Sequence, residues 1–295
     1  MPTSSGIVFG PAGWAYPDWE GAVYPRPRHR SFHPLRYLAD FVDCVEVNAT
    51  FYAPVSESAA RDWVRRIADR PRFGFLVKLW GACTHGPDWP DREALRRWTK
   101  VLSPLIDSGR FLGLLAQFPP RIQFGSPLLQ RLDTLRATFP ALPIAVELRH
   151  HSALLPEFLA ALRERDLAFV NIDQPAYPGG LGESCEVTAS WGYVRLHGRN
   201  RDAWFDSQAG RDARYDYRYS RQELLPWVGR IRSLEARTAR VVVVGNNHFH
   251  GKAIAAVLEL AHLLSEGPVA IPETLLHTYP DLLPLALPLQ GGLFL

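Results

Sequence analysis

Polar side chains that can bind anions or transfer protons follow short apolar runs throughout this 295-residue sequence. Three runs end in two such residues separated by one apolar residue: Glu46 and Asn48, Glu147 and Arg149, and Arg195 and His197. Residues two apart on a β-strand face the same way, so each pair should project from one face. Other runs end in further polar residues: Lys78, Gln117, Asp173 and Asn246.

These residue types are suited to acid–base chemistry on an anionic substrate. The candidate catalytic groups, whose pKa values would have to be shifted by their surroundings, are Glu46, Glu147, Asp173 and His197. The candidate phosphate or carboxylate ligands are Lys78, Arg149, Arg195 and Arg199. Residues expected to orient or contact the substrate are Asn48, Gln117, Asn246, His85, Trp14 and Tyr16. The alternative is a structural ion-pair network, in which three acids and three bases neutralise one another.

The apolar runs have the length of buried parallel strands, and eight of them are predicted. They cover Ile7–Gly10, Cys44–Asn48, Phe73–Leu79, Phe111–Phe118, Ile144–Arg149, Ala168–Asp173, Tyr193–Gly198 and Val241–Asn246. Helical patterns separate most of them, at Glu57–Arg70, Asp91–Ser108, 126–139, Leu154–Asp166, Ser220–Arg237 and Gly251–Ser265. This alternation predicts an α/β fold, a single TIM-type (β/α)8 barrel whose active site lies at the carboxyl ends of the strands.

Three connections depart from this pattern. Gln174–Gly192 is rich in proline and glycine, so the sixth helix is expected to be lost or vestigial. Pro11–Ser31 and Arg199–Tyr219 are long loops, which in this fold belong to the face where substrates bind. We expect one domain over residues 1–295, with a Pro/Leu-rich tail from about 268 that packs on the barrel.

Ordered motifs at these strand ends resemble the YecE-like, or DUF72, family. They are Gly13-Trp14-Ala15-Tyr16 with Trp19, Glu46-Val47-Asn48-Ala49-Thr50-Phe51-Tyr52, Thr84-His85, Gln117-Phe118-Pro119-Pro120, Glu147-Leu148-Arg149-His150, Arg195-Leu196-His197-Gly198-Arg199 and Asn246-Asn247-His248. The resemblance covers about residues 10–264 and implies a TIM-type barrel without an established activity. The sequence differs from the family pattern after His150, where Ser152 and Ala153 stand instead of a tryptophan, and at Gly245, where an aromatic residue is usual.

Three classes of function remain open. The first is an enzyme, a hydrolase or isomerase, that binds an anionic small molecule at the barrel mouth. The second is a nucleic-acid-binding or endonuclease IV-like protein, because aromatic residues alternate with arginines in both long loops. In the seventh loop these residues are Trp204, Phe205, Tyr215, Tyr217 and Tyr219 with Arg199, Arg201, Arg211, Arg214 and Arg218. The third is a non-catalytic binding protein.

We expect no tightly bound metal and no other cofactor, with Mg²⁺ or Mn²⁺ arriving weakly with substrate as the exception. Glu147, Asp173 and His197 are a possible ligand set of the kind that xylose isomerase and endonuclease IV use. The fixed charges of Arg149 and Arg195, two residues from Glu147 and His197, would compete with a cation there.

Composition indicates a cytoplasmic protein. The three cysteines are scattered, which fits a reducing compartment, and neither a secretory signal nor a membrane-spanning run is recognisable. The net charge of +3 neither requires nor excludes nucleic acid, and the sequence does not indicate an oligomeric state.

Overall fold

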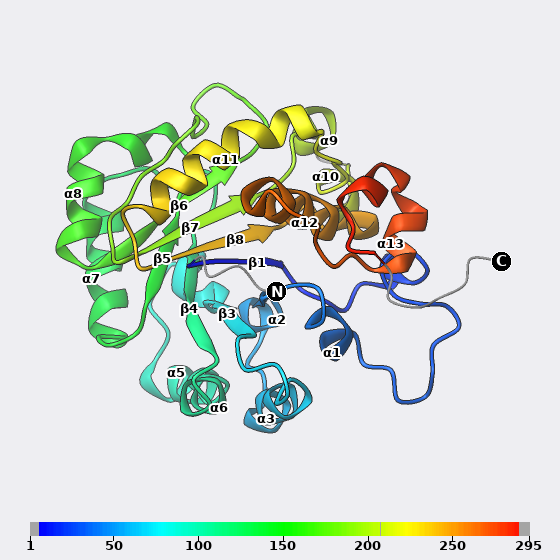
Figure 1. The fold of residues 1–295 in the computed structure, drawn as a ribbon. Coiled ribbons are helices and arrows are strands. Elements are labelled where there is room, and N and C mark those ends of the chain that lie inside the picture. The colour runs from blue at the N-terminus through cyan, green and yellow to red at the C-terminus, as the bar shows by residue number, and fades with distance from the viewer. Residues whose placement is uncertain (1–5, 207, 289–295) are drawn as a thin grey trace.

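Eight parallel strands form a nearly closed barrel in the computed structural model, which describes residues 6–206 and 208–288, without two side chains, Phe205 and Arg211 (Figure 1). The strands are β1 (Ile7–Pro11), β2 (Cys44–Val47), β3 (Gly74–Lys78), β4 (Phe111–Gln117), β5 (Ile144–Glu147), β6 (Leu167–Asp173), β7 (Trp191–Leu196) and β8 (Arg240–Gly245). Hydrogen bonds link them in the order β1-β8-β7-β6-β5-β4-β3-β2. The predicted eight parallel strands of a TIM-like fold are therefore confirmed.

The seam between β1 and β2 closes through single contacts rather than a full ladder. Ala12 and Glu46 form an isolated parallel bridge, and the N–H of Gly13 donates to the carbonyl oxygen of Glu46 at 2.8 Å. The backbones approach so closely that a Cβ on Gly10 would lie 1.9 Å from the carbonyl oxygen of Cys44. Closure therefore requires glycine at position 10, because any side chain there would force the strands apart.

Helices surround the barrel, with α7, α8, α11 and α12 on one side and α3, α5 and α6 on another (Figure 1). The longer ones are α3 (Glu57–Arg66), α5 (Arg92–Thr99), α7 (Ser126–Thr138), α8 (Pro156–Glu164), α11 (Arg221–Glu235) and α12 (Lys252–Ser265). The shorter ones are α1 (Pro34–Leu38), α2 (Ala49–Tyr52), α4 (Gly81–Thr84), α6 (Leu102–Asp107), α9 (Arg201–Phe205), α10 (Arg211–Arg214) and α13 (Glu273–Thr278). Local signals set their starts: Ser220 and Glu223 form a capping box at α11.

One predicted helix was wrong in extent. The segment 91–108 contains two helices, α5 and α6, which meet at Lys100 and Val101. The break lies just before Pro104, which has no N–H to donate to the carbonyl oxygen four residues back. Proline is tolerated within the first turn of a new helix, so the chain restarts at Leu102.

The connections at the carboxyl ends of the strands carry short elements of their own. The first long loop holds a 3-10 turn at Pro17–Trp19, and the seventh holds α9 and α10. The connection between β6 and β7, residues 174–190, contains no helix over its described length. Side chains tie this connection to β6 instead. The amide of Asn171 in β6 bonds to the backbone of Glu186, and the hydroxyl of Thr188 bonds to the backbone of Leu167 and Phe169 in β6.

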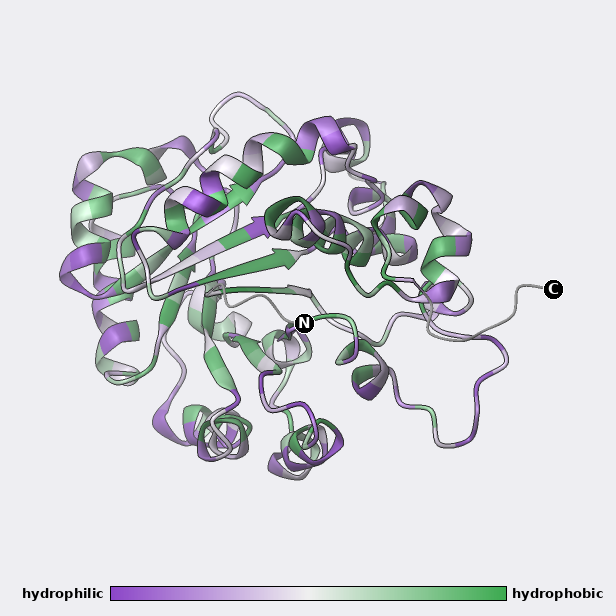
Figure 2. Ribbon diagram, viewed as in Figure 1, coloured by the Kyte–Doolittle hydropathy of each residue, from purple (hydrophilic) through white to green (hydrophobic). Residues whose placement is uncertain are grey.

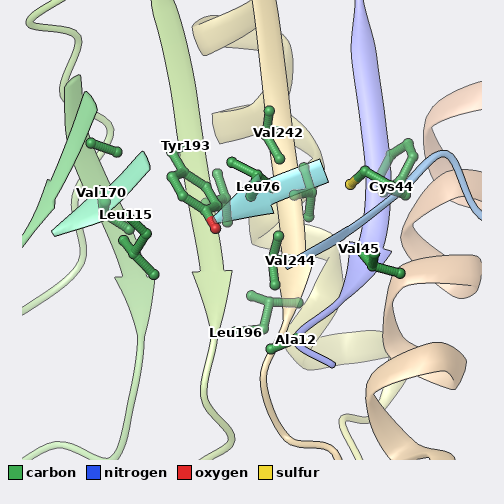
Figure 3. Close-up of a cluster of buried hydrophobic side chains, with 14 of the residues drawn as sticks. Ala12, Cys44, Val45, Leu76, Leu115, Val170, Tyr193, Leu196, Val242 and Val244 are labelled. Atoms are coloured by element: carbon green, nitrogen blue, oxygen red, sulfur yellow. The ribbon is translucent and has the colours of Figure 1, made fainter. Parts of the chain in front are cut away.

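Apolar side chains fill both the inside of the barrel and the layer under the helices. Figure 2 shows hydrophobic strands at the centre and helices whose colour alternates along each turn, as expected for amphipathic helices against a core. Inside the barrel, Leu76, Leu115, Val170, Tyr193 and Val242 point toward one another below the mouth (Figure 3). These layers form a rigid floor for the polar groups above them.

The described part of the Pro/Leu-rich tail packs against the last helices. Leu275, Leu276, Leu282 and Leu285 are buried, and residue Val269 pairs with Ala286 in a short bridge. Residues 289–295 of this tail lie outside the described residues, and so do residues 1–5 of the N-terminal segment, in which no secretory signal was expected. Within the described ranges, no helix combines the length and the apolar character needed to cross a lipid bilayer.

Candidate functional site

The strand register shows which side chains point into the barrel. Two residues that pair in register on neighbouring parallel strands point to the same face of the sheet. Gln117 pairs with Glu147 in this way, and Ile172 pairs with Arg195. Arg195 also contacts Glu46 across the barrel, which fixes this face as the interior. The interior residues near the mouth are Glu46, Asn48, Lys78, Gln117, Glu147, Arg149, Arg195, His197 and Asn246.

Arg195 is the centre of a buried ion-pair network. Its side chain is inaccessible to solvent, and it donates from Nε and Nη2 to the two oxygens of Glu46 at 2.9 and 2.8 Å. Nη1 lies 2.5 Å from a carboxylate oxygen of Glu147, and Nη2 also reaches the amide oxygen of Asn246 at 3.2 Å. The hydroxyl of Tyr193 donates a hydrogen bond to the carboxylate of Glu46. Because the guanidinium of Arg195 is bonded to both carboxylates, its main role is to link β2, β5 and β7.

Asn246 and Glu147 fix the orientation of His197. Arg195 can only donate, so the amide atom of Asn246 that faces it is the oxygen. The amide nitrogen therefore donates to Nδ1 of His197 at 2.9 Å, which leaves the proton of a neutral imidazole on Nε2. Nε2 lies 3.2 Å from a carboxylate oxygen of Glu147. Burial, and after it the charge of Arg149, lowers the pKa of His197 to about 3.

The depressed pKa of His197 predicts a pH dependence of stability. The unfolded chain binds a proton at this residue near its ordinary pKa of 6.5 and the folded chain only near 3, so stability is complete above 6.5 and is lost as pH falls. Between pH 6.5 and 4.5 the free energy of unfolding should fall by about 2 kcal/mol more in the parent than in His197→Gln, measured by urea unfolding. The exposed His277→Gln should keep the parent's slope; a parallel decline in His197→Gln would contradict the assignment.

Arg149 has one terminal nitrogen without a partner. Its Nε donates to Glu147 at 3.0 Å, and its guanidinium lies over the ring of Trp204, 5.3 Å from the ring centroid. The residue is 5% exposed, and Nη2 is buried without a hydrogen-bond partner among the described residues. A buried donor left unsatisfied costs about 1–3 kcal/mol, a cost that a bound acceptor would remove.

Lys78 is a second cation without an acidic partner among the described residues. Its ammonium group lies over the ring of Phe51, 4.5 Å from the centroid, and the side chain is half-buried. Burial, and after it the charge of Arg195, lowers the pKa of Lys78 to about 8. The ring of His85 also packs edge-on with Phe51, with the ring centroids 4.9 Å apart. Desolvation, and after it the charge of Lys78, lowers the pKa of His85.

Two amide side chains complete the interior of the mouth. Asn48 is half-buried at the end of β2, and its Oδ1 is enclosed without a hydrogen-bond partner in the described part of the chain. Gln117 is half-buried at the end of β4, beside Glu147 in register. Oδ1 of Asn48 can therefore accept one hydrogen bond from a bound molecule.

Asp173 and Arg199, expected at the mouth, lie elsewhere. Asp173 pairs in register with Leu196, whereas the interior face carries Arg195, so its carboxylate points outward to α11. There it accepts hydrogen bonds from Trp227 and Tyr219, each at 2.8 Å. It also accepts hydrogen bonds from Nε and Nη2 of Arg199, at 2.8 and 2.6 Å. The assignment of Asp173 to the interior was wrong, because polarity near a strand end does not fix the face.

The saturation of Asp173 predicts a purely structural role. In Asp173→Asn the amide nitrogen would oppose a donor on Trp227 or Arg199, and stability should fall by about 2–4 kcal/mol in urea unfolding. Binding of an anion at the mouth should stay within about twofold of the parent, since the carboxylate faces away from Arg149 and Lys78. Unchanged stability in Asp173→Asn would contradict this role.

The aromatic residues of the long loops pack against one another beside the mouth. Tyr16 stacks on His248 at 4.3 Å, and Tyr215 lies between His248 and Trp204. Trp14 instead packs edge-on against a tryptophan of α3. Arg199 and Arg218 of the seventh loop form ion pairs, and Tyr219 is buried against Asp173. These aromatic and charged side chains therefore pack with one another along one side of the mouth. The side chains of Phe205 and Arg211 lie outside the described part of the chain.

Sequence reasoning missed two residues of this arrangement. Tyr193 precedes Arg195 by two positions, so the alternation that selected Arg195 would have placed it on the same face. Phe51 belongs to the motif that begins at Glu46 but carries no charge and was not expected at the site, although its ring lies beneath the ammonium group of Lys78. In the described residues no three His, Cys, Asp or Glu side chains are grouped closely enough to hold a metal ion.

A hollow of about 970 Å³ lies elsewhere, at the outer face of β1 and beside α12. Its lining is mostly apolar, with Ile7, Phe9 and Leu258, and its charged residues include Asp43 and Arg72. None of the candidate site residues reaches it. The chemistry-bearing groups gather instead at the carboxyl ends of the strands, which is where barrel enzymes act.

Comparison with known proteins agrees with the predicted resemblance. Residues 8–278 match the family described as "Protein of unknown function DUF72". UPF0759 protein YunF of Bacillus subtilis is 27% identical over 280 residues, 88% of this chain and 94% of that protein. The DUF72 protein TM1631 of Thermotoga maritima is 31% identical with a TM-score of 0.77, covering 88% of this chain and 99% of the other. EF0366 of Enterococcus faecalis, 24% identical over 88% of this chain and 95% of its own, has the same TM-score of 0.77. On this fold and these matches, the chain belongs to the DUF72 family.

Proposed function

We propose that the barrel mouth binds a small anionic molecule bearing a carboxylate or phosphate group. The observation that carries this proposal is the buried Nη2 of Arg149, which has no hydrogen-bond partner in the described residues. Arginine presents a planar fork suited to carboxylate and phosphate oxygens. Its half-buried neighbour Lys78 supplies a point charge within electrostatic range.

The charge balance of the mouth supports an anion. Once Asp173 is paired with Arg199 outside the barrel, two carboxylates, on Glu46 and Glu147, face three cations. His197 does not add to the excess, because its lowered pKa keeps it uncharged near pH 7. One positive charge thus remains unmatched in a poorly solvated site, where an anionic ligand would be strongly favoured.

Lys78 can exchange a proton near neutral pH, because its pKa is about 8. Although burial alone would raise the pKa of Glu147, Arg195 and its neighbours hold it well below the ordinary value. His197 stays neutral for the reason given above. Lys78, with a pKa of about 8, is therefore better suited to proton transfer than the carboxylates first considered. This supports an enzyme, of the hydrolase or isomerase kind, over a purely structural network.

Nucleic acid is the less supported ligand. Stacking of unpaired bases needs accessible aromatic faces, and Tyr219 is buried while Trp204 and Tyr215 pack on each other. Arg199 and Arg218 already form ion pairs with acidic side chains. A compact anion at the strand ends therefore accounts for more of the geometry than a polyanion along the loops.

Calorimetric titration with inorganic phosphate, sulfate and acetate tests the proposal. We expect one anion per chain, with affinity that falls as pH rises through about 8 because Lys78 loses its proton. A short single-stranded oligonucleotide serves as the comparison. Strong binding of the oligonucleotide with no measurable binding of small anions would favour the nucleic-acid alternative.

A further inference from the structure

Lys78 stands apart from the other two lysines of the chain. Lys252 is paired with Asp216, and Lys100 is exposed to solvent. Lys78 points into the mouth from the last position of β3, with an aromatic ring rather than a carboxylate beneath its ammonium group. Among the described residues no acid forms an ion pair with this half-buried amine, and such a lysine can become a nucleophile.

We propose that Lys78 forms a Schiff base with an aldehyde or ketone whose carboxylate or phosphate group is held by Arg149. This inference rests on the anion site proposed above and names the substrate class: a small carbonyl compound with an anionic group. Lys78 is the last residue of β3, and Arg149 follows the end of β5 by two residues and bonds to the interior Glu147. The charge of Arg149 acts on Lys78, so we infer that one short molecule can reach both groups.

The surroundings of Lys78 favour the free amine. Burial, and after it the charges of Arg195 and Arg149, lowers the pKa of its ammonium group. Glu46 and Glu147, whose carboxylates are bonded to Arg195, oppose this shift without cancelling it. Phe51 stabilises the cation only weakly compared with a carboxylate partner. The resulting pKa of about 8 leaves roughly a tenth of the amine uncharged at pH 7, against less than a thousandth for an ordinary lysine.

The chemical step balances without a further reactant. The lone pair on Nζ attacks the carbonyl carbon, and the carbon–oxygen π electrons move to oxygen, which takes up a proton. Nitrogen loses a proton to give the neutral carbinolamine. A second proton on the hydroxyl lets it depart as water while the nitrogen lone pair forms the carbon–nitrogen double bond, and loss of the remaining N–H proton leaves the imine. His85, which packs against Phe51 and has a lowered pKa, is placed to supply and accept these protons.

Reductive trapping with sodium cyanoborohydride tests this inference. The full-length protein is treated at pH 7 with glyoxylate, an anionic aldehyde, or with propionaldehyde, a neutral one, and adducts are located by peptide mass mapping. Lys100 and Lys252 are internal references in the same sample. We expect glyoxylate to label Lys78 at least about tenfold faster than Lys100, and Arg149→Met to remove most of this advantage for glyoxylate but not for propionaldehyde.

The outcomes separate the two proposals. Equal labelling of Lys78 and Lys100 by both aldehydes, in protein that binds phosphate, would overturn the nucleophile and leave the anion site standing. Preferential labelling of Lys78 by propionaldehyde, with no gain from the carboxylate of glyoxylate, would overturn the anion site instead. Because the parent protein carries its own reference lysines, the result does not depend on any variant folding.

Discussion

Replacing Arg195 with methionine is expected to destabilise the protein by about 3–5 kcal/mol, because two buried carboxylates would lose their partner. Arg195 links Glu46 and Glu147, and neither carboxylate is accessible to solvent. Methionine fills part of the volume but offers no donor. Urea unfolding at pH 7 measures the loss.

Two comparisons sharpen this expectation. Arg96→Met removes an exposed arginine from α5 and should change stability by less than about 0.5 kcal/mol. Adding Glu46→Gln and Glu147→Gln to Arg195→Met should recover part of the loss, because no uncompensated charge then remains buried. If Arg195→Met unfolds at the same urea concentration as Arg96→Met, the network is not a structural link between the strands.

Replacing Arg149 with methionine should weaken phosphate binding by about 10- to 100-fold, the loss of one or two charge-assisted hydrogen bonds. The reason is the unpartnered Nη2, which is the donor best prepared to receive an anion. Glu147 keeps Arg195 as its partner in this variant, so the fold should survive. Calorimetry at low ionic strength gives the affinity.

Arg96→Met is again the matched control, since it removes one positive charge of the same kind far from the mouth. Its phosphate affinity should equal that of the parent. A similar loss in Arg96→Met and Arg149→Met would mean that net charge, and not a specific donor, governs anion binding.

Much of the site was predictable because strand geometry is regular. The alternation of Glu46 with Asn48, Glu147 with Arg149, and Arg195 with His197 places each pair on one face once a strand is assumed. The barrel then gathers these faces at one end, so the meeting of Arg195 with both glutamates follows from topology.

The direction of the Asp173 side chain could not be predicted from strand alternation alone. β6 carries polar residues on its outward face, since Asn171 bonds to the helix-free connection and Asp173 to α11. A polar residue on a strand can serve the barrel interior or the layer outside it. The sequence of one strand does not distinguish these, because the phase depends on register with β7.

The excess positive charge at the barrel mouth could not be predicted from the sequence either. A count of three acids and three bases suggested neutrality, yet the structure removes one acid and leaves Lys78 and a nitrogen of Arg149 without acceptors in the described residues. Partner choice among buried charges depends on distances of a few ångströms, which residue spacing does not supply. The same holds for Phe51, whose importance lies only in its place under Lys78.

Anomalous diffraction from crystals soaked with selenate, a tetrahedral dianion of the size of phosphate, tests the central claim most directly. The account predicts one strong selenium peak inside the mouth, within hydrogen-bond distance of Nη2 of Arg149 and close to Nζ of Lys78, and no such peak in Arg149→Met crystals. Selenate bound only at exposed arginines of the loops, with the mouth of the parent protein empty of selenium, would contradict it.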